Sequence, residues 1–270
     1  MAPLPPVQTP GRGRALVTGA SSGLGAAFAV ALAQRQYNLI IVARSQARLE
    51  ALAADLRHQH GIAVEVLVAD LTDAEALHDV AVRVRHDDAL TLLVNNAGFG
   101  TTGPFATLTS DEEEAEIRLN VMALVCLTHA ALPGMIARRQ GAIINVSSLA
   151  ALFPGPYHAT YGATKAYVNS FTEALHEELR GTGVHIQALC PGFTHTEFQQ
   201  RAGVDTSRIP RFAWMTADTV VEASLQALLR RQVICVPGGL NRFLAFLLGV
   251  LPRPLVRRTL GCLAARVLAK

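Results

Sequence analysis

The stretch TGASSGLG at residues 18–25 places three glycines within seven residues, directly after the apolar run at residues 15–17. Its spacing, G-x-x-x-G-x-G, differs from the common dinucleotide fingerprint, and no lysine follows as in a nucleotide-triphosphate loop. Glycines let the backbone approach phosphates closely, and free N–H groups at the start of a helix attract an anion. We therefore predict a diphosphate-binding turn, with a plain tight turn as the alternative. Its predicted contacts are Gly19, Ser21, Ser22, Gly23, Leu24 and Gly25.

Short apolar runs alternate with segments of helical spacing along most of the chain. This alternation predicts an α/β fold with a doubly wound, Rossmann-like parallel sheet of about seven strands in a single domain. Asp73 and Asp111 are the expected N-caps of two helices. We expect strands at 14–18, 38–43, 63–68, 91–95, 142–147, 184–189 and 233–236. We expect helices at 24–35, 46–60, 73–85, 111–139, 158–180 and 217–231.

Length and composition indicate one large domain, since the 270 residues are 50% hydrophobic and 17% charged. The proline-rich start does not look like a signal peptide, so we divide the chain into a flexible arm (1–11), a catalytic domain (12–239) and a hydrophobic, basic extension (240–270). The four cysteines are widely spaced, which favours neither a disulfide framework nor a zinc site and fits a cytoplasmic protein. The histidines form no ligand spacing, so no metal is expected.

The extension combines apolar and basic residues. After Glu222 the chain has eight basic residues and no acidic one. No aromatic residues interleave with these charges as a nucleic-acid reader would need. Residues 243–251 are almost wholly apolar but too short to span a bilayer, and Val256, Leu260, Leu263 and Val267 continue as a helical stripe. Three roles stay open: the interface of a homodimer or homotetramer, an arm over the substrate pocket, or a helix lying on a membrane.

Further motifs follow the glycine turn in a characteristic order. The sequence Asn95-Asn96-Ala97-Gly98 follows the fourth expected strand, Ser148 lies thirteen residues before Tyr161-x-x-x-Lys165, and Pro191-Gly192 follows the sixth strand. Together they make residues 12–236 resemble the short-chain dehydrogenase/reductase family. The resemblance implies a nicotinamide-dependent enzyme that interconverts a carbonyl compound and a secondary alcohol.

Tyr161 and Lys165 are expected on one helix face, a turn apart. The lysine ammonium should therefore lower the tyrosine pKa from its usual value near 10. Ser148 is expected to orient the substrate carbonyl, with Ser147 as the competing candidate. The resemblance implies that Lys165 binds the cofactor ribose and that Asn120 holds a water linking Lys165 to solvent. An Asn120 satisfied by local backbone is the alternative.

The end of the second strand bears on the choice of cofactor. Arg44-Ser45 stands where an NAD enzyme would carry an acidic residue, and an arginine can pair with the extra phosphate of NADP. NADP(H) is therefore favoured over NAD(H), although Ser21 and Ser22 stand where many NADP-preferring relatives have a basic residue. A solvated Arg44 is the alternative.

The remaining cofactor contacts are implied by the resemblance alone. Asp70, followed by Leu71, would contact the adenine amino group, and Asn96, Ala97 and Gly98 would pack beneath the adenine ribose. The loop that would bind the nicotinamide carboxamide contributes Pro191, Gly192, Thr194 and Thr196.

We thus expect an NADP(H)-dependent oxidoreductase acting on a small-molecule carbonyl or alcohol that is largely hydrophobic. An apolar set in the segment 193–215 supports this substrate class: Phe193, Phe198, Phe212, Trp214 and Met215. The alternatives are an NAD(H)-linked alcohol or hydroxysteroid-type dehydrogenase and a non-catalytic NADP-binding regulator.

Overall fold

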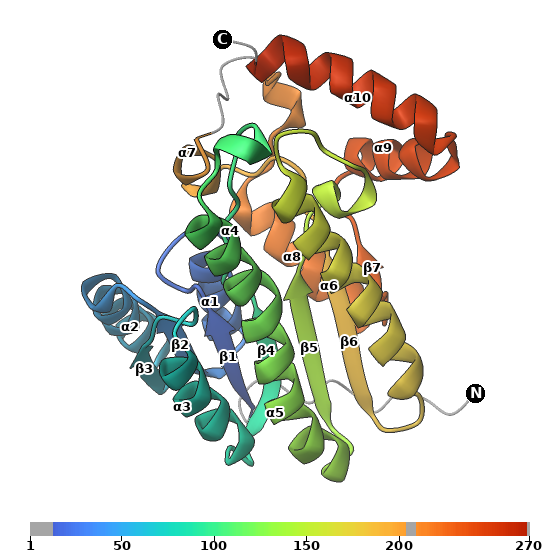
Figure 1. The fold of residues 1–270 in the computed structure, drawn as a ribbon. Coiled ribbons are helices and arrows are strands. Elements are labelled where there is room, and N and C mark those ends of the chain that lie inside the picture. The colour runs from blue at the N-terminus through green and yellow to red at the C-terminus, as the bar shows by residue number, and fades with distance from the viewer. Residues whose placement is uncertain (1–12, 204–208, 269–270) are drawn as a thin grey trace.

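A computed structural model describes residues 13–203 and 209–268. The seven predicted strands form one parallel sheet in the order β3-β2-β1-β4-β5-β6-β7, which confirms the doubly wound, Rossmann-like fold (Figure 1). The predicted arm at 1–11 lies outside the described residues. The strands are β1 (Arg14–Thr18), β2 (Asn38–Ala43), β3 (Val64–Val68), β4 (Leu90–Asn95), β5 (Gly141–Val146), β6 (Val184–Leu189) and β7 (Ile234–Cys235).

Helices cover both faces of the sheet, which explains why the strands are continuously apolar. On β1, Val17 packs into the core shared with α1, α2 and α8, whereas Leu16 packs into the core shared with α3 and α5. The larger helices are α1 (Gly23–Gln34), α2 (Gln46–His60), α3 (Ala74–Arg85), α4 (Ser110–Ile117), α5 (Leu124–Ala137), α6 (Ala159–Glu178) and α8 (Ala217–Leu229). Shorter elements are the 3-10 turns η1 (Phe105–Thr107), η3 (Leu149–Leu152) and η4 (Arg211–Ala213) and the helix α7 (Phe198–Arg201).

The helix predicted at 111–139 differs from the prediction in two ways. A π-helical segment, η2 (Arg118–Ala123), separates α4 from α5. The N-cap is Thr109, whose side chain accepts the Glu112 N–H, so the prediction of Asp111 was wrong. Asp111 instead lies in the first turn, where negative charge favours the helix dipole. The prediction of Asp73 is confirmed, since its carboxylate accepts the Ala76 N–H at 2.8 Å.

The continuous helical stretch Ser110–Ala137 is long and apolar enough to cross a membrane by length and composition. It nevertheless packs on the sheet, with Leu127 and Met135 almost wholly buried in the core. This stretch is therefore a core helix of the domain.

The extension forms two helices, α9 (Gly239–Val250) and α10 (Arg253–Leu268), beyond the edge where the strands end (Figure 1). Asn241 anchors α9, because its buried amide donates to the Pro237 carbonyl at 2.9 Å. The opposite face is open to solvent, with Phe243 and Phe246 61% and 67% exposed. The side chains of Leu260, Leu263 and Val267 lie outside the described residues.

Candidate active site

The glycine turn is locked against the segment that follows β4. The Thr18 hydroxyl accepts the N–H groups of Asn96 and Ala97, each at 2.9 Å, and the Asn96 amide donates to the Thr18 carbonyl at 2.8 Å. Gly19 has a left-handed φ of 66°, and a Cβ on Gly25 would collide with the Gly19 carbonyl oxygen. The turn therefore needs glycine at both positions for conformation and close approach.

The first turn of α1 is suited to hold a diphosphate. Ser22 is the N-cap, but its side chain makes no capping hydrogen bond to the described residues, so the first N–H groups of the helix are not satisfied by it. Gly23 has a φ of 55° and brings the backbone around the turn without a side chain. A dinucleotide would be held here by Gly19, Ser21, Ser22, Gly23, Leu24 and Gly25 through backbone contacts and the helix dipole.

The predicted catalytic side chains come together where β5 meets α6. Lys165 donates from its buried Nζ to the Val146 carbonyl at 2.9 Å, and Nζ lies 5.7 Å from the centre of the Tyr161 ring. The Ser148 side chain lies close enough to the Tyr161 hydroxyl to favour a lower pKa of the tyrosine. The Ser147 hydroxyl instead donates to the Lys165 carbonyl at 3.0 Å, which turns it away from the tyrosine. The geometry thus pairs Ser148, and not Ser147, with Tyr161.

Burial governs the protonation of Tyr161 and Lys165. It raises the pKa of Tyr161 to about 12, even though Ser148 acts in the opposite direction. Burial also lowers the pKa of Lys165 to about 8. The expectation that the tyrosine pKa is lowered is therefore wrong for the protein without cofactor, because the loss of hydration dominates and the Glu116 charge acts in the same direction. The phenol keeps its proton at neutral pH, as an acid in carbonyl reduction requires.

Asn120 lies in η2 and is 1% exposed. Its amide donates to the Phe99 carbonyl at 2.8 Å and to the Thr164 hydroxyl at 3.1 Å, and its Oδ1 accepts the Phe99 N–H at 3.1 Å. These partners lie outside its own helix, so it is not satisfied by local backbone. A Cβ on Gly98 would lie 2.8 Å from Asn120 Oδ1 and 3.4 Å from Lys165 Nζ, so the three residues meet.

Gly100 is a site residue that sequence reasoning missed. A Cβ at this position would lie 2.7 Å from Cδ2 of Tyr161, closer than any real packing contact. The signal was present in the sequence as a second glycine two residues after Gly98. The backbone at 98–100 therefore packs directly against Lys165 and Tyr161.

Arg44 and Asp70 lie together at the ends of β2 and β3. Asp70 accepts the Thr72 N–H and hydroxyl at 3.0 and 2.7 Å, and its other oxygen lies 3.6 Å from Arg44. Burial raises the pKa of Asp70, but the bonds from Thr72 and Arg44 outweigh this and lower it overall. The Arg44 side chain is 75% exposed, which leaves its guanidinium accessible to a ligand. Ser45 is the N-cap of α2, and Leu71 is buried in the core.

The loop after β6 folds towards the glycine turn. The Pro191 carbonyl accepts the Leu149 N–H at 2.9 Å, and a Cβ on Gly192 would lie 2.7 Å from the Asn241 amide of α9. Thr194 pairs with Met215 as an isolated bridge. A Cβ on Gly23 would lie 3.2 Å from the side chain of Thr196, so this loop and the glycine turn are in contact.

Helix α7 packs against Tyr161. The ring of Phe198 lies 5.5 Å from that of Tyr161, centre to centre. The preceding residue, Glu197, forms a 2.9 Å ion pair with Arg48 of α2. This pair ties the start of α7 to α2.

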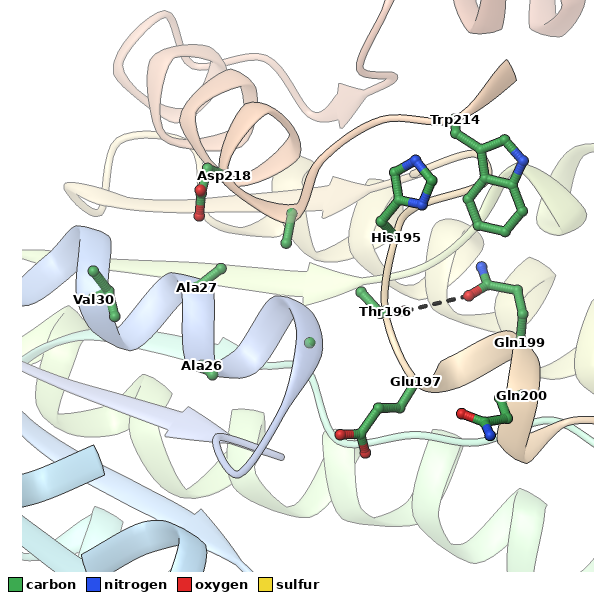
Figure 2. A pocket seen from close by; sticks show the side chains of 12 residues that line it. Ala26, Ala27, Val30, His195, Thr196, Glu197, Gln199, Gln200, Trp214 and Asp218 are labelled. Atoms are coloured by element: carbon green, nitrogen blue, oxygen red, sulfur yellow. Dashed lines mark hydrogen bonds between the residues drawn. The ribbon is translucent and has the colours of Figure 1, made fainter. Parts of the chain in front are cut away.

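A cavity of about 780 Å³ opens between the start of α1 and the segment 195–200 (Figure 2). Ser148, Tyr161 and Lys165 are not among its lining residues, so it borders the glycine turn and lies beside the catalytic group. Its walls are formed by Gly23, Ala26, Ala27, Val30, His195, Thr196, Glu197, Gln199, Gln200, Trp214, Ala217 and Asp218. A second cavity of about 350 Å³ lies between η1, Tyr157 and α10.

Comparison with known proteins agrees with this geometry. A family model described as short chain dehydrogenase matches residues 14–206. The chain is 31% identical over 258 residues to a very-long-chain 3-oxoacyl-CoA reductase from Anas platyrhynchos, covering 93% of this chain and 80% of that protein.

Two solved structures are similar over most of their length. One is a short-chain dehydrogenase from Sphingobium yanoikuyae in complex with NADPH, with 39% identity and a TM-score of 0.82 over 87% of this chain and 91% of that one. The other is a bulky-bulky ketone specific alcohol dehydrogenase from Comamonas testosteroni, with 30% identity and a TM-score of 0.77 over 89% and 95%.

The contact between Gly100 and Tyr161 predicts a sensitive position. Gly100→Ala should displace the Tyr161 ring and lower kcat by about 100-fold, the usual consequence of moving a catalytic group by about 1 Å. Gly155→Ala is the matched control, because its added Cβ would lie 3.8 Å from Phe153. Steady-state kinetics of both variants test this, and equal activities would contradict the packing described.

Proposed function

The chain belongs to the short-chain dehydrogenase family, and on that premise we propose that it is an NADP(H)-dependent reductase of bulky, largely hydrophobic carbonyl compounds. The observation that carries this proposal is the Ser148–Tyr161–Lys165 group, in which a buried phenol keeps its proton beside a serine hydroxyl. Such a group can donate a proton to a carbonyl oxygen as the carbon is reduced.

Each side chain of the group has a distinct role in this proposal. Tyr161 donates its proton to the carbonyl oxygen, and the Ser148 hydroxyl holds that oxygen by a second hydrogen bond. Lys165 binds the cofactor ribose and compensates the charge left on the phenolate. Asn120, which lies beside Gly98 with Lys165, supports the path by which Lys165 exchanges protons with solvent. NADPH, when bound, supplies the hydride.

Arg44 and Ser45 support NADP(H) as the cofactor. The guanidinium of Arg44 is exposed at the end of β2 and can form a charge-assisted pair with a phosphate ester. Asp70 holds it only loosely, at 3.6 Å, so a dianionic phosphate can compete. The similar Sphingobium dehydrogenase is in complex with NADPH, which agrees with this choice.

A bulky apolar substrate agrees with the residues over the catalytic group. Phe198 packs on Tyr161, and the ring of Phe193 lies 5.6 Å from that of Trp214, so aromatic side chains gather at Tyr161 and in the segment after β6. The relatives named above are a reductase of very-long-chain 3-oxoacyl-CoA and an alcohol dehydrogenase for bulky-bulky ketones. Both names describe a carbonyl flanked by large groups.

For the extension, we infer an arm beside the substrate site whose outer face lies on an anionic lipid surface. Gly261 of α10 lines the smaller cavity with Tyr157 and η1, which brings the arm to the substrate side. Exposed Phe243 and Phe246 are accompanied by exposed arginines and no acidic residue, which suits anionic headgroups.

Replacing Tyr161 tests the catalytic proposal. Tyr161→Phe removes the proton donor and should lower kcat roughly 10²- to 10⁴-fold, while the NADPH Kd changes little. The control is Tyr167→Phe on the same helix, whose ring is half exposed and stacks on Phe171. Turnover of Tyr161→Phe within tenfold of the wild type would contradict the assignment and favour a non-catalytic binding role.

Replacing Arg44 tests the cofactor. Arg44→Gln should lower kcat/KM for NADPH about 10- to 100-fold, the effect of losing one charge-assisted pair, with little effect for NADH. Arg85→Gln, an exposed position on α3, serves as the control. Wild-type activity with NADH equal to that with NADPH would overturn the role of Arg44 and favour the NAD(H)-linked alternative.

Sedimentation with vesicles tests whether the extension at 240–270 binds a lipid surface. The full chain should bind phosphatidylglycerol vesicles and not phosphatidylcholine vesicles, and the double variant Phe243→Glu/Phe246→Glu should remain in the supernatant. Light scattering would detect a different role: a fall in mass of that variant would identify a subunit interface and contradict the membrane assignment.

A further inference from the structure

Two acidic side chains are buried behind the catalytic group and have no part in the chemistry described so far. Glu113 and Glu116 lie three residues apart on one face of α4, with 9% and 0% of their surfaces exposed. Burying a carboxylate is costly unless it is paired or protonated. The groups around Glu113 and Glu116 must therefore either pair with these carboxyl groups or keep them protonated.

A single hydroxyl joins the two carboxyl groups. Oγ1 of Thr101 lies 2.6 Å from Oε1 of Glu113 and 2.8 Å from Oε2 of Glu116. The Thr101 N–H donates to the same Glu116 oxygen at 2.8 Å, and the Thr160 hydroxyl contacts the other oxygen of Glu113. Thr160 directly precedes the catalytic Tyr161. The unit formed by Glu113, Thr101 and Glu116 is called the carboxyl pair below.

The single hydroxyl proton of Thr101 determines the net charge of the carboxyl pair. A hydroxyl has one proton and can donate it to one carboxylate only, so the second short contact needs a proton on a carboxyl group. Two ionised carboxylates held by one hydroxyl would also repel each other strongly in a buried site. The pair therefore holds one proton and one net negative charge near neutral pH, and burial raises the pKa of Glu116 accordingly.

The Glu116 end of the carboxyl pair lies beside the part of α6 that carries Tyr161 and Lys165. Glu113 contacts Thr160 and Asn120 donates to Thr164, so Glu116 lies between these two contacts along α6. The Glu116 charge acts on both Tyr161 and Lys165, raising the pKa of Tyr161 and opposing the fall in the pKa of Lys165, and the Lys165 charge acts back on Glu116. Oε1 of Glu116 has no hydrogen-bond partner among the described residues. Glu113 contacts Thr160, five residues before Lys165, and therefore marks the end of the pair that is farther along α6 from the lysine.

The other titratable groups around this site carry no charge near neutral pH. Burial raises the pKa of the Cys190 thiol to about 11, so it stays protonated beside Lys165. His158 contacts the Thr101 carbonyl and the Thr102 hydroxyl, and burial lowers its pKa, so its ring is neutral. Within the described part of the chain, the carboxyl pair is thus the counter-charge that Lys165 senses.

We propose that the shared negative charge of the carboxyl pair keeps Lys165 protonated in its buried site, so that Glu116 is a positioning residue that sets the upper pH limit of catalysis. This inference rests on the proposed function for the role of Lys165. Glu116 acts through the lysine and touches neither substrate nor cofactor.

The test titrates Lys165 directly and does not depend on turnover. Lys165 and Lys270 are the two lysines of the chain, so carbon-13 labelling of lysine side chains gives two NMR signals. Glu116→Gln keeps the shape but leaves the single charge on Glu113, farther along α6 from the lysine, so the pKa of Lys165 should fall by about one unit, as expected when an opposite charge is moved away. Lys270 should titrate unchanged. The alkaline limb of kcat/KM for reduction should move to lower pH by the same amount.

Three variants separate charge from structure. Glu116→Asp keeps the charge and should restore the wild-type titration. Glu114→Gln is the matched control, since Glu114 is exposed on the same helix and pairs with Arg118. Glu113→Gln should leave the Lys165 pKa nearly unchanged, because the remaining carboxyl group then ionises fully and the single charge persists.

An unchanged Lys165 pKa in Glu116→Gln would overturn the proposal. An equal fall in Glu113→Gln and Glu116→Gln would overturn the shared proton, because it would mean that both groups are ionised in the wild type. A protein without reductase activity would instead contradict the proposed function and leave the NMR titrations to decide this inference by themselves.

Discussion

The site depends on one buried contact, the hydrogen bond from the Lys165 ammonium to the Val146 carbonyl at the end of β5. It ties α6 to the sheet at the point where Ser147 also binds the Lys165 backbone. Tyr161, one turn earlier, is thereby brought to Ser148. Burying the ammonium group removes its hydration and so lowers the pKa of Lys165. A nearby negative charge is therefore needed to keep the lysine protonated.

Parallel strands explain why residues far apart in sequence meet here, since all their carboxyl ends lie at one edge of the sheet. The turn after β1, the segment after β4 and the serine after β5 are joined by direct contacts through Thr18, Asn96, Gly98 and Lys165. The loop after β6 then folds back over Gly23. The order of the motifs along the chain was therefore enough to predict which side chains the fold brings together.

Other features could not be predicted because they depend on packing. The spacing of Tyr161 and Lys165 indicates proximity but not burial, so the direction of the tyrosine pKa shift was predicted wrongly. In the run DEEEAE at 111–116, Glu113 and Glu116 look like part of a solvated acidic face until Thr101 is seen to bind both of them. The hydrophobic pattern of this apolar helix does not distinguish the π-helical segment around Asn120 from ordinary α-helix. Asp111 and Thr109 are both acceptable caps, and the chain path selects Thr109.

The most direct test of the account is the titration of the Tyr161 phenol in the protein without cofactor, by NMR of tyrosines labelled at Cζ. The chain has four tyrosines, so the signal that disappears in Tyr161→Phe can be assigned without ambiguity. If the loss of hydration is the dominant effect, the Tyr161 phenol should have a pKa of about 12. A pKa at or below the ordinary value near 10 would contradict the account, because it would mean that the lysine charge outweighs burial.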